Sequence, residues 1–235
     1  YFTHIESGKT KKIASDDLYT PGVFRELFGD WSPDSNWISY TTINEANFEQ
    51  AYLYGLSENK SYIISDGLSN ITSPVFDPSG KYLYMLASTD AGPVVNWFDQ
   101  SNQDMEMSNS IYLVTLQKET ISPFAKENDT EDLNAETTDE SDKDKKEEKK
   151  PEQLKIDWDG IQNRIVDIPI SSGMYYNLSA PKEGELYYLA YTPHGGSTQL
   201  HKYGLKNRKD ETIMPADDYE IAAKILNVIR ENTNI

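Results

Sequence analysis

The sequence predicts an all-β fold, a fragment of a β-propeller with about three full four-stranded blades and partial blades at both ends. A motif of an aromatic residue, one further residue, Pro and a short polar turn recurs along the chain, and an alternating apolar run follows each copy. The chain has 16 Tyr, and aromatic residues make up 11% of it, which favours strands over helices. Four short strands in every ~40–45 residues are typical of propeller blades.

The predicted blades follow one another along the chain. Residues 1–14 fit only the last two strands of a blade. Full blades are expected over residues 22–66, 70–170 and 173–215, and residues 218–235 fit only the first part of another. Because a closed propeller needs about 4–8 blades, this number cannot close a ring. We therefore expect the chain to be part of a longer protein, which would also cover its edge strands.

Each blade is expected to open with a strand that ends in a tight turn. Pro33 and Pro78 would take the second turn position, where the φ angle of Pro is already set near about −65°. Gly80 would supply the left-handed residue of the second copy, and Asn36 would do so in the first, since Asn tolerates that conformation. The third copy carries Pro181 but lacks the Asp-Gly turn.

The other strands of each blade follow from the alternating apolar runs, because alternation places one face of a strand in the core. The expected second strands are 37–40, 82–86 and 186–191, the third strands 51–54, 111–116 and 200–203, and the fourth strands 62–64, 164–168 and 212–214.

Aromatic residues on or beside these strands are expected to pack between neighbouring blades, because propeller cores are built from such layers. This set comprises Trp31, Phe76, Tyr82, Tyr84, Tyr187 and Tyr188.

Two long segments interrupt the second blade. Residues 126–153 hold 12 Asp or Glu and six Lys, with Leu133 as their only large apolar residue. Such a composition cannot offset the entropy of ordering, so we expect disorder. A solvated loop is favoured over an interaction tail.

The other segment, residues 89–108, carries apolar residues outside a clear strand, and exposed apolar loops often contact a partner. It is the candidate interaction loop, with Val94, Val95, Trp97, Phe98, Met105 and Met107.

Charge and composition exclude several functions. The net charge is −17, so phosphates would be repelled and neither a nucleic acid nor an anionic membrane is an expected partner. The chain has no Cys, which excludes disulfides, thiolate metal sites, Cys nucleophiles and iron–sulfur clusters. No apolar run approaches the ~18–20 residues of a membrane helix.

Catalytic and cofactor motifs are mostly missing. His4, His194 and His201 are the candidates for proton transfer, but no Gly-x-Ser-x-Gly nucleophile motif accompanies them. There is no calcium loop, zinc helix or phosphate loop. Asp157 and Asp159 flank a Trp and are expected to cap a turn or belong to a blade, with metal binding as a minority option. We therefore expect no catalytic residue, metal or cofactor in this chain.

The sequence resembles two groups of propellers. WSPDSNWISYT (31–41) and FDPSGKYLYMLAS (76–88) are similar to the Ser-Pro-Asp-Gly repeat of TolB-type β-propellers. Three further stretches resemble the propeller region of tricorn-type serine proteases, specifically the second propeller of bacterial homologues. They are SNITSPVFDPSGKYLYMLASTDAGP (69–93), SIYLVTLQKETISPFA (110–125) and KIDWDGIQNRIVDIPISSGMYYNLSA (155–180). The resemblance covers most of residues 1–220.

That resemblance implies a function. Tricorn-type proteases pair two propellers with a PDZ-like module and a C-terminal serine-peptidase domain, and their propellers gate or channel peptides. We therefore expect a non-catalytic propeller domain whose partners are peptides or unfolded polypeptides and the other domains of the protease, with homo-oligomerisation as an option. The family's catalytic residues belong to the peptidase domain, so none is carried over to this chain.

Two alternatives remain open at this stage. One is a TolB-like propeller that scaffolds protein partners, and the other is the propeller of a prolyl-oligopeptidase-type hydrolase. The resemblance to exported bacterial homologues implies a periplasmic location, with the cytoplasm as the alternative.

Overall fold

The computed structural model describes residues 1–15, 29–46, 48–88, 108–125, 153–192 and 196–219. These residues form one two-stranded and three four-stranded antiparallel sheets, which confirms the predicted all-β propeller fold. The predicted interaction loop, nearly all of the acidic insert, and His194 lie outside the described residues, as does the segment after Tyr219. No helix in the described part of the chain is long and apolar enough to cross a membrane.

Each four-stranded sheet is one blade, and its strands pair in sequence order. Strands β1 (Phe2–Thr3) and β2 (Thr10–Lys11) form the small N-terminal sheet. Blade 1 holds β3 (Gly29–Trp31), β4 (Trp37–Ile43), β5 (Glu49–Gly55) and β6 (Lys60–Ile63). Blade 2 holds β7 (Asn70–Phe76), β8 (Tyr82–Ser88), β9 (Ser110–Thr115) and β10 (Ile165–Asp167). Blade 3 holds β11 (Met174–Lys182), β12 (Glu185–Thr192), β13 (Ser197–Gly204) and β14 (Lys209–Pro215).

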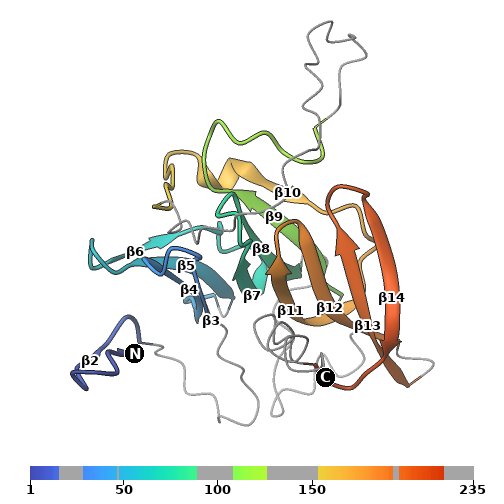
Figure 1. The fold of residues 1–235 in the computed structure, drawn as a ribbon, viewed down its shortest axis with the longest axis horizontal. Coiled ribbons are helices and arrows are strands. Elements are labelled where there is room, and N and C mark those ends of the chain that lie inside the picture. Colours follow the sequence, from blue (N-terminus) through green and yellow to red (C-terminus); the bar gives the residue numbers. More distant parts are fainter. Residues whose placement is uncertain (16–28, 47, 89–107, 126–152, 193–195, 220–235) are drawn as a thin grey trace, which may run out of the picture.

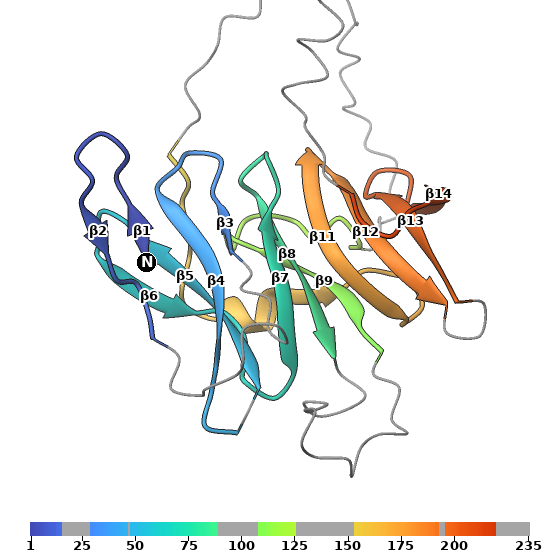
Figure 2. The same ribbon diagram turned by 90° about the horizontal axis from the view of Figure 1, so that it is seen from below.

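The three blades stand side by side in an arc (Figures 1 and 2). Their first strands β3, β7 and β11 contact one another in that order, as the inner strands of a propeller do. Turns between the first and second strands, and between the third and fourth, therefore emerge on one face of the arc. We call this the turn face.

The proline turns have the predicted geometry, with one correction. The Ser35 N–H donates to the Ser32 carbonyl at 2.8 Å, and the Gly80 N–H donates to the Asp77 carbonyl at 2.9 Å. Each Pro thus occupies the second turn position. The left-handed residue of the first turn is Ser35, with φ 58°, and the prediction of Asn36 was wrong. The carboxylate of Asp34 explains this, because it accepts from both the backbone and the side-chain nitrogen of Asn36.

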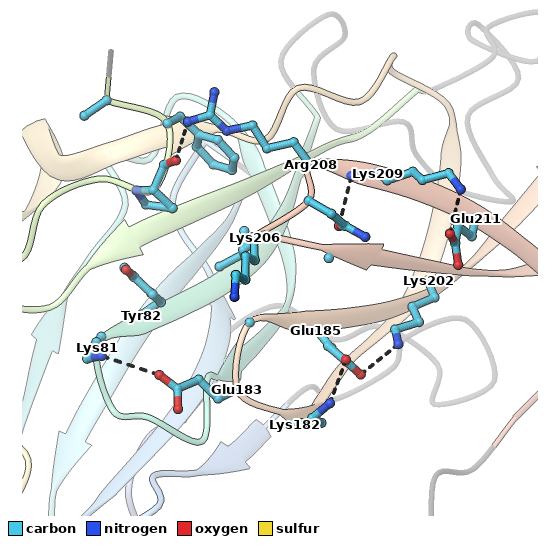
Figure 3. Close-up of a pocket in the computed structure, with 17 residues that line it drawn as sticks. Lys81, Tyr82, Lys182, Glu183, Glu185, Lys202, Lys206, Arg208, Lys209 and Glu211 are labelled. Atoms are coloured by element: carbon cyan, nitrogen blue, oxygen red, sulfur yellow. Dashed lines mark hydrogen bonds and ion pairs between the residues drawn. The ribbon is translucent and has the colours of Figure 1, made fainter. Parts of the chain in front are cut away.

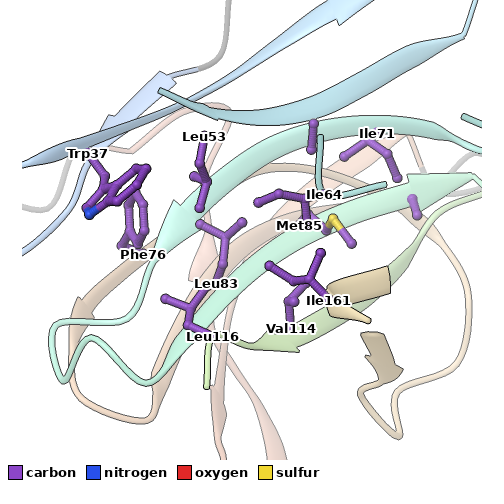
Figure 4. Packing of buried hydrophobic residues seen from close by; sticks show 12 residues of the cluster. Trp37, Leu53, Ile64, Ile71, Phe76, Leu83, Met85, Val114, Leu116 and Ile161 are labelled. Carbon is purple, nitrogen blue, oxygen red and sulfur yellow. The ribbon is translucent and has the colours of Figure 1, made fainter. Parts of the chain in front are cut away.

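Apolar side chains fill both spaces between blades. One cluster, shown in Figure 4, joins blades 1 and 2, and a second joins blades 2 and 3. Phe76, Tyr84 and Tyr188 are buried in these clusters as predicted. Tyr82 and Tyr187 are half-buried. Trp31 is 49% exposed, so the prediction of a core role for it was wrong. It is the last residue of the three-residue strand β3, whose two end residues are both exposed.

A segment that the sequence left unassigned packs across the first two blades. Residues 154–161, which we call the strap, lead into a short 3-10 helix, η2 (Ile161–Arg164). Leu154, Ile156 and Trp158 lie against the cluster between blades 1 and 2. The Trp158 ring stacks on Tyr62 with a centroid separation of 3.9 Å. The strap therefore ties blade 2 to the outer strand of blade 1.

Tyr219 anchors the end of the described chain on blade 3. Its hydroxyl lies 2.5 Å from the Asn177 carbonyl and 2.8 Å from the Tyr187 carbonyl. Burial raises the pKa of Tyr219 to about 12. Burial also raises the pKa of Tyr84 and of Tyr188 well above the ordinary range of a phenol.

These raised pKa values predict a tyrosine titration in two stages. A phenol whose pKa is higher in the folded than in the unfolded state contributes stability that is complete below about pH 10. That stability is lost as the pH rises through the folded pKa. We expect the phenolate absorbance of Tyr84, Tyr188 and Tyr219 to appear after that of the exposed tyrosines, together with unfolding. Ionisation of all 16 tyrosines below about pH 11, with the fold intact, would contradict this.

Candidate functional site

A pocket of about 1130 Å³ opens on the turn face between blades 2 and 3 (Figure 3). Four segments build it. The β11–β12 turn and the β13–β14 turn come from blade 3, and the start of β8 comes from blade 2. Residues 123–125 close one side, and the guanidinium of Arg208 fixes them by donating to the Pro123 carbonyl at 2.8 Å. The volume of the pocket is slightly above the roughly 300–1,000 Å³ that is usual for ligand-binding clefts.

The described lining is strongly basic for a chain of this charge. The lining contains six Lys or Arg and three Glu, whereas the whole chain has a net charge of −17. The cations are Lys81, Lys182, Lys202, Lys206, Arg208 and Lys209, and the carboxylates are Glu183, Glu185 and Glu211. Figure 3 shows Lys206 in the middle of this group. The local excess is three positive charges.

Each of the three carboxylates already has a cationic partner. Glu183 pairs with Lys81 at 3.4 Å, and Glu211 pairs with Lys209 at 2.9 Å. Glu185 lies 2.9 Å from both Lys182 and Lys202, and the hydrogen bond from Lys182 lowers the pKa of its carboxyl group. None of these three carboxylates pairs with Lys206 or Arg208.

The turn that carries Lys206 and Arg208 has a counterpart in blade 1. Residues 54–60 read YGLSENK and residues 203–209 read YGLKNRK. Both segments join a third to a fourth strand, and the strand ends pair in the same way, Gly55 with Lys60 and Gly204 with Lys209. The fifth residue after the Tyr of each segment has a left-handed backbone, with φ 53° at Asn59 and 50° at Arg208. The two turns share a backbone and differ in charge.

A second pocket, of about 690 Å³, lies beside the first and shares Lys81 and Tyr82 with it. Gln153 and Leu154 line this second pocket, and Ala125 lines the first. Ala125, which precedes the acidic insert, and Gln153, the last residue of the insert, therefore both lie at pockets of the turn face.

A His–Asp pair sits apart from the pocket lining, on blade 3. The Nδ1 atom of His201 lies 3.0 Å from the Asp210 carboxylate, and its Nε2 atom lies 3.4 Å from the Thr212 hydroxyl. The His201 ring stacks on Tyr188, whose hydroxyl donates to Asp210 at 2.8 Å. The order acid, imidazole, hydroxyl is that of a hydrolytic triad.

The other candidates from the sequence have local partners. His4 lies in the N-terminal hairpin, where its Nδ1 atom is 3.2 Å from the Ser7 hydroxyl. Asp157 accepts from the Lys118 backbone at 2.8 Å, and Asp159 pairs with the Lys118 ammonium at 2.6 Å. Asp157 thus caps the turn at residues 117–120, as expected, whereas Asp159 forms an exposed ion pair with a side chain. Within the described residues, no group of three or more His, Asp or Glu could hold a metal ion.

Sequence reasoning missed the basic pocket. Its walls come from turns that are about 100 residues apart in the chain, and the turn residues carry no periodicity. One signal was available: the run LKNRK at 205–209 concentrates three cations in a strongly acidic chain.

Comparison with known proteins gives a consistent result. The model of the tricorn protease second β-propeller domain family matches residues 1–230. A tricorn-like protease C-terminal subunit from Sulfurisphaera tokodaii is 27% identical over 158 residues, which cover 67% of this chain and 16% of that protein. A tricorn protease homologue from Saccharolobus solfataricus is 26% identical over 189 residues, which cover 77% of this chain and 16% of that protein.

Among solved structures, the crystal structure of the tricorn protease superposes with a TM-score of 0.64 at 17% identity. The match covers 94% of this chain and 21% of that one, and it shows the shared fold. The chain spans about one sixth of the length of the curated relatives it matches.

Proposed function

The chain belongs to the tricorn protease second β-propeller domain family, and on that premise we propose that it gates or channels peptides toward a peptidase domain without cleaving them itself. One observation of the structure supports this most: the turn face holds a pocket of about 1130 Å³ whose walls combine charged side chains with Tyr82, Phe124 and Leu205. Such mixed walls suit a peptide, which presents both polar backbone and apolar side chains.

Site-specific photo-crosslinking tests this proposal. A photoreactive residue replaces Asn207 in the pocket turn, and a matched variant carries it at Glu58, the equivalent position of the blade 1 turn. Both positions are exposed and lie on the same backbone geometry. We expect a mixed peptide pool to label the Asn207 variant at least about fivefold more than the Glu58 variant. Equal labelling of the Asn207 and Glu58 variants would contradict the binding of peptides at this pocket.

A second function, hydrolysis by this chain itself, is favoured by the array of Asp210, His201 and Thr212. Two features speak for a structural role instead. The 3.4 Å separation between Nε2 and the Thr212 hydroxyl is long for an activated nucleophile, and Asp210 is shared with the Tyr188 hydroxyl. We propose that the array fastens β14 to β13.

Substitution separates the two roles. His201→Ala and Thr212→Val, in the full-length protein, are expected to leave the kcat/KM of peptide cleavage within about twofold. The control is the thermal stability of each variant, which should fall because His201→Ala removes the contact with Asp210 and Thr212→Val removes the contact with His201. A fall of about a thousandfold or more in kcat, with the fold retained, would instead assign the chemistry to this array.

A further inference from the structure

We propose that the pocket between blades 2 and 3 selects acidic peptides, meaning extended segments with several carboxylates next to apolar side chains. This inference rests on the proposed function, because it names the ligand class of the same pocket. The determinants are Lys206 and Arg208 of the β13–β14 turn, with Phe124 as the apolar contact.

The first argument is the charge that the lining leaves unbalanced. The three Glu of the lining form ion pairs with lysines other than Lys206. Lys206 has no acidic partner among the described residues, and the contacts of Arg208 there are the Pro123 carbonyl and the Phe124 ring. Carboxylates of a ligand would supply the missing negative charge for both Lys206 and Arg208, and Arg binds a carboxylate through two parallel hydrogen bonds.

The second argument is that the backbone of the turn does not require these cations. Blade 1 builds the same turn with Ser57, Glu58 and Asn59, where blade 3 has Lys206, Asn207 and Arg208. The left-handed position favours Asn over Arg, and Arg208 occupies it with φ 50°. A conformationally unfavourable residue that the turn itself does not need points to a function.

The third argument concerns the apolar part of the ligand. The Arg208 guanidinium lies 5.9 Å from the centroid of the Phe124 ring, and both side chains line the pocket together with Leu205. A carboxylate bound to Arg208 would therefore bring its neighbouring side chains against Phe124. This pairing of charge and ring distinguishes an acidic peptide from a simple inorganic anion.

The source of the acidic peptide has two options with the same chemistry. It can be a separate polypeptide, which the proposed function favours. It can also be the insert of this chain, whose residues 126–153 carry 12 Asp or Glu and six Lys. Ala125, just before the insert, and Gln153, its last residue, lie at the two pockets. Replacing residues 126–152, which are all but the last residue of the insert, by a short Gly-Ser linker distinguishes the two options. Tighter binding of an added acidic peptide would identify the insert as a competitor, and unchanged binding would identify a separate polypeptide.

A turn exchange tests the selectivity with a turn sequence that blade 1 already accommodates, although it removes the hydrogen bond from Arg208 to the Pro123 carbonyl. In the full-length protein, Lys206→Ser, Asn207→Glu and Arg208→Asn together install the blade 1 turn in blade 3. The probes are a fluorescent ten-residue peptide of Glu, Leu and Ala and the same peptide with Gln for Glu. We expect the wild type to bind the Glu peptide at least about tenfold more tightly at low salt, and the exchange to bring the two peptides within about twofold.

A charge-matched control removes the effect of net charge. Lys9→Ser with Lys12→Glu also lowers the charge by three, at exposed positions near the N-terminal sheet, and should leave the preference unchanged. Equal binding of both peptides to the wild type, or a preference that survives the turn exchange, would overturn the acidic selectivity while peptide binding stands. Binding of neither peptide would overturn the proposed function and this inference together.

Discussion

Replacing Asp77 with Ala is expected to lower the free energy of unfolding by about 3–5 kcal/mol. Asp77 is fully buried. Its carboxylate accepts from the Tyr84 hydroxyl at 2.7 Å and from the Gly184 N–H at 2.8 Å, which ties blade 2 to blade 3 beside the basic pocket. It also accepts from the Ser79 N–H at 2.9 Å and so fixes the proline turn. The substitution leaves the buried Tyr84 hydroxyl and the two half-buried backbone N–H groups without this acceptor.

Urea denaturation measures this effect against a matched substitution. Asp66 is exposed and caps a turn through one bond of 3.0 Å to the Leu68 N–H, so Asp66→Ala should cost about 1 kcal/mol or less. Asp77→Asn should also destabilise, because the amide would turn an NH₂ group toward groups that are themselves donors. Similar losses for Asp77→Ala and Asp66→Ala would refute the role of Asp77 as the tie between blades.

Removal of the Trp158 ring from the strap is the second change for which we expect a large loss of stability. Trp158→Ala should cost about 2–4 kcal/mol, because the ring stacks on Tyr62 at 3.9 Å and contacts Trp37 at 5.3 Å between ring centroids. The loss would loosen the strap where it leads into the second pocket at Leu154. Thermal or urea unfolding of the full-length protein provides the measurement.

Trp31→Ala is the control for Trp158, since Trp31 is 49% exposed. Its replacement should change the stability by about 0.5 kcal/mol or less. If the two substitutions cost the same, or if Trp31→Ala costs more, the strap does not hold the blades together in the way the contacts indicate.

The strands were predictable from the sequence because their signal is local. Alternating apolar runs such as YLYMLAS in β8 put one face in the core whatever the rest of the chain does. Pro78 and Gly80 likewise fix their turn with their own backbone preferences. The left-handed residue of the first turn was misplaced because the carboxylate of Asp34 decides it, and no backbone preference of Ser35 indicates it.

The strap and the pocket could not be predicted because their contacts are distant in the chain. The Leu154 N–H donates to Asp34, 120 residues earlier, and an eight-residue strap without periodicity gives no sign of that partner. The pocket depends on how the turns of two blades meet. Comparing the turn sequences YGLSENK and YGLKNRK would have drawn attention to Lys206 and Arg208, although their shared pocket needed the fold.

The most direct test of the central claim is peptide cleavage by the full-length protein and by residues 1–235 alone, side by side on one mixed peptide pool. A cooperative unfolding transition first shows that the shorter chain is folded. We expect the full-length protein to cleave the pool, and the chain alone to bind peptides and release them intact. Cleavage by the purified chain would contradict a non-catalytic propeller and return attention to His201.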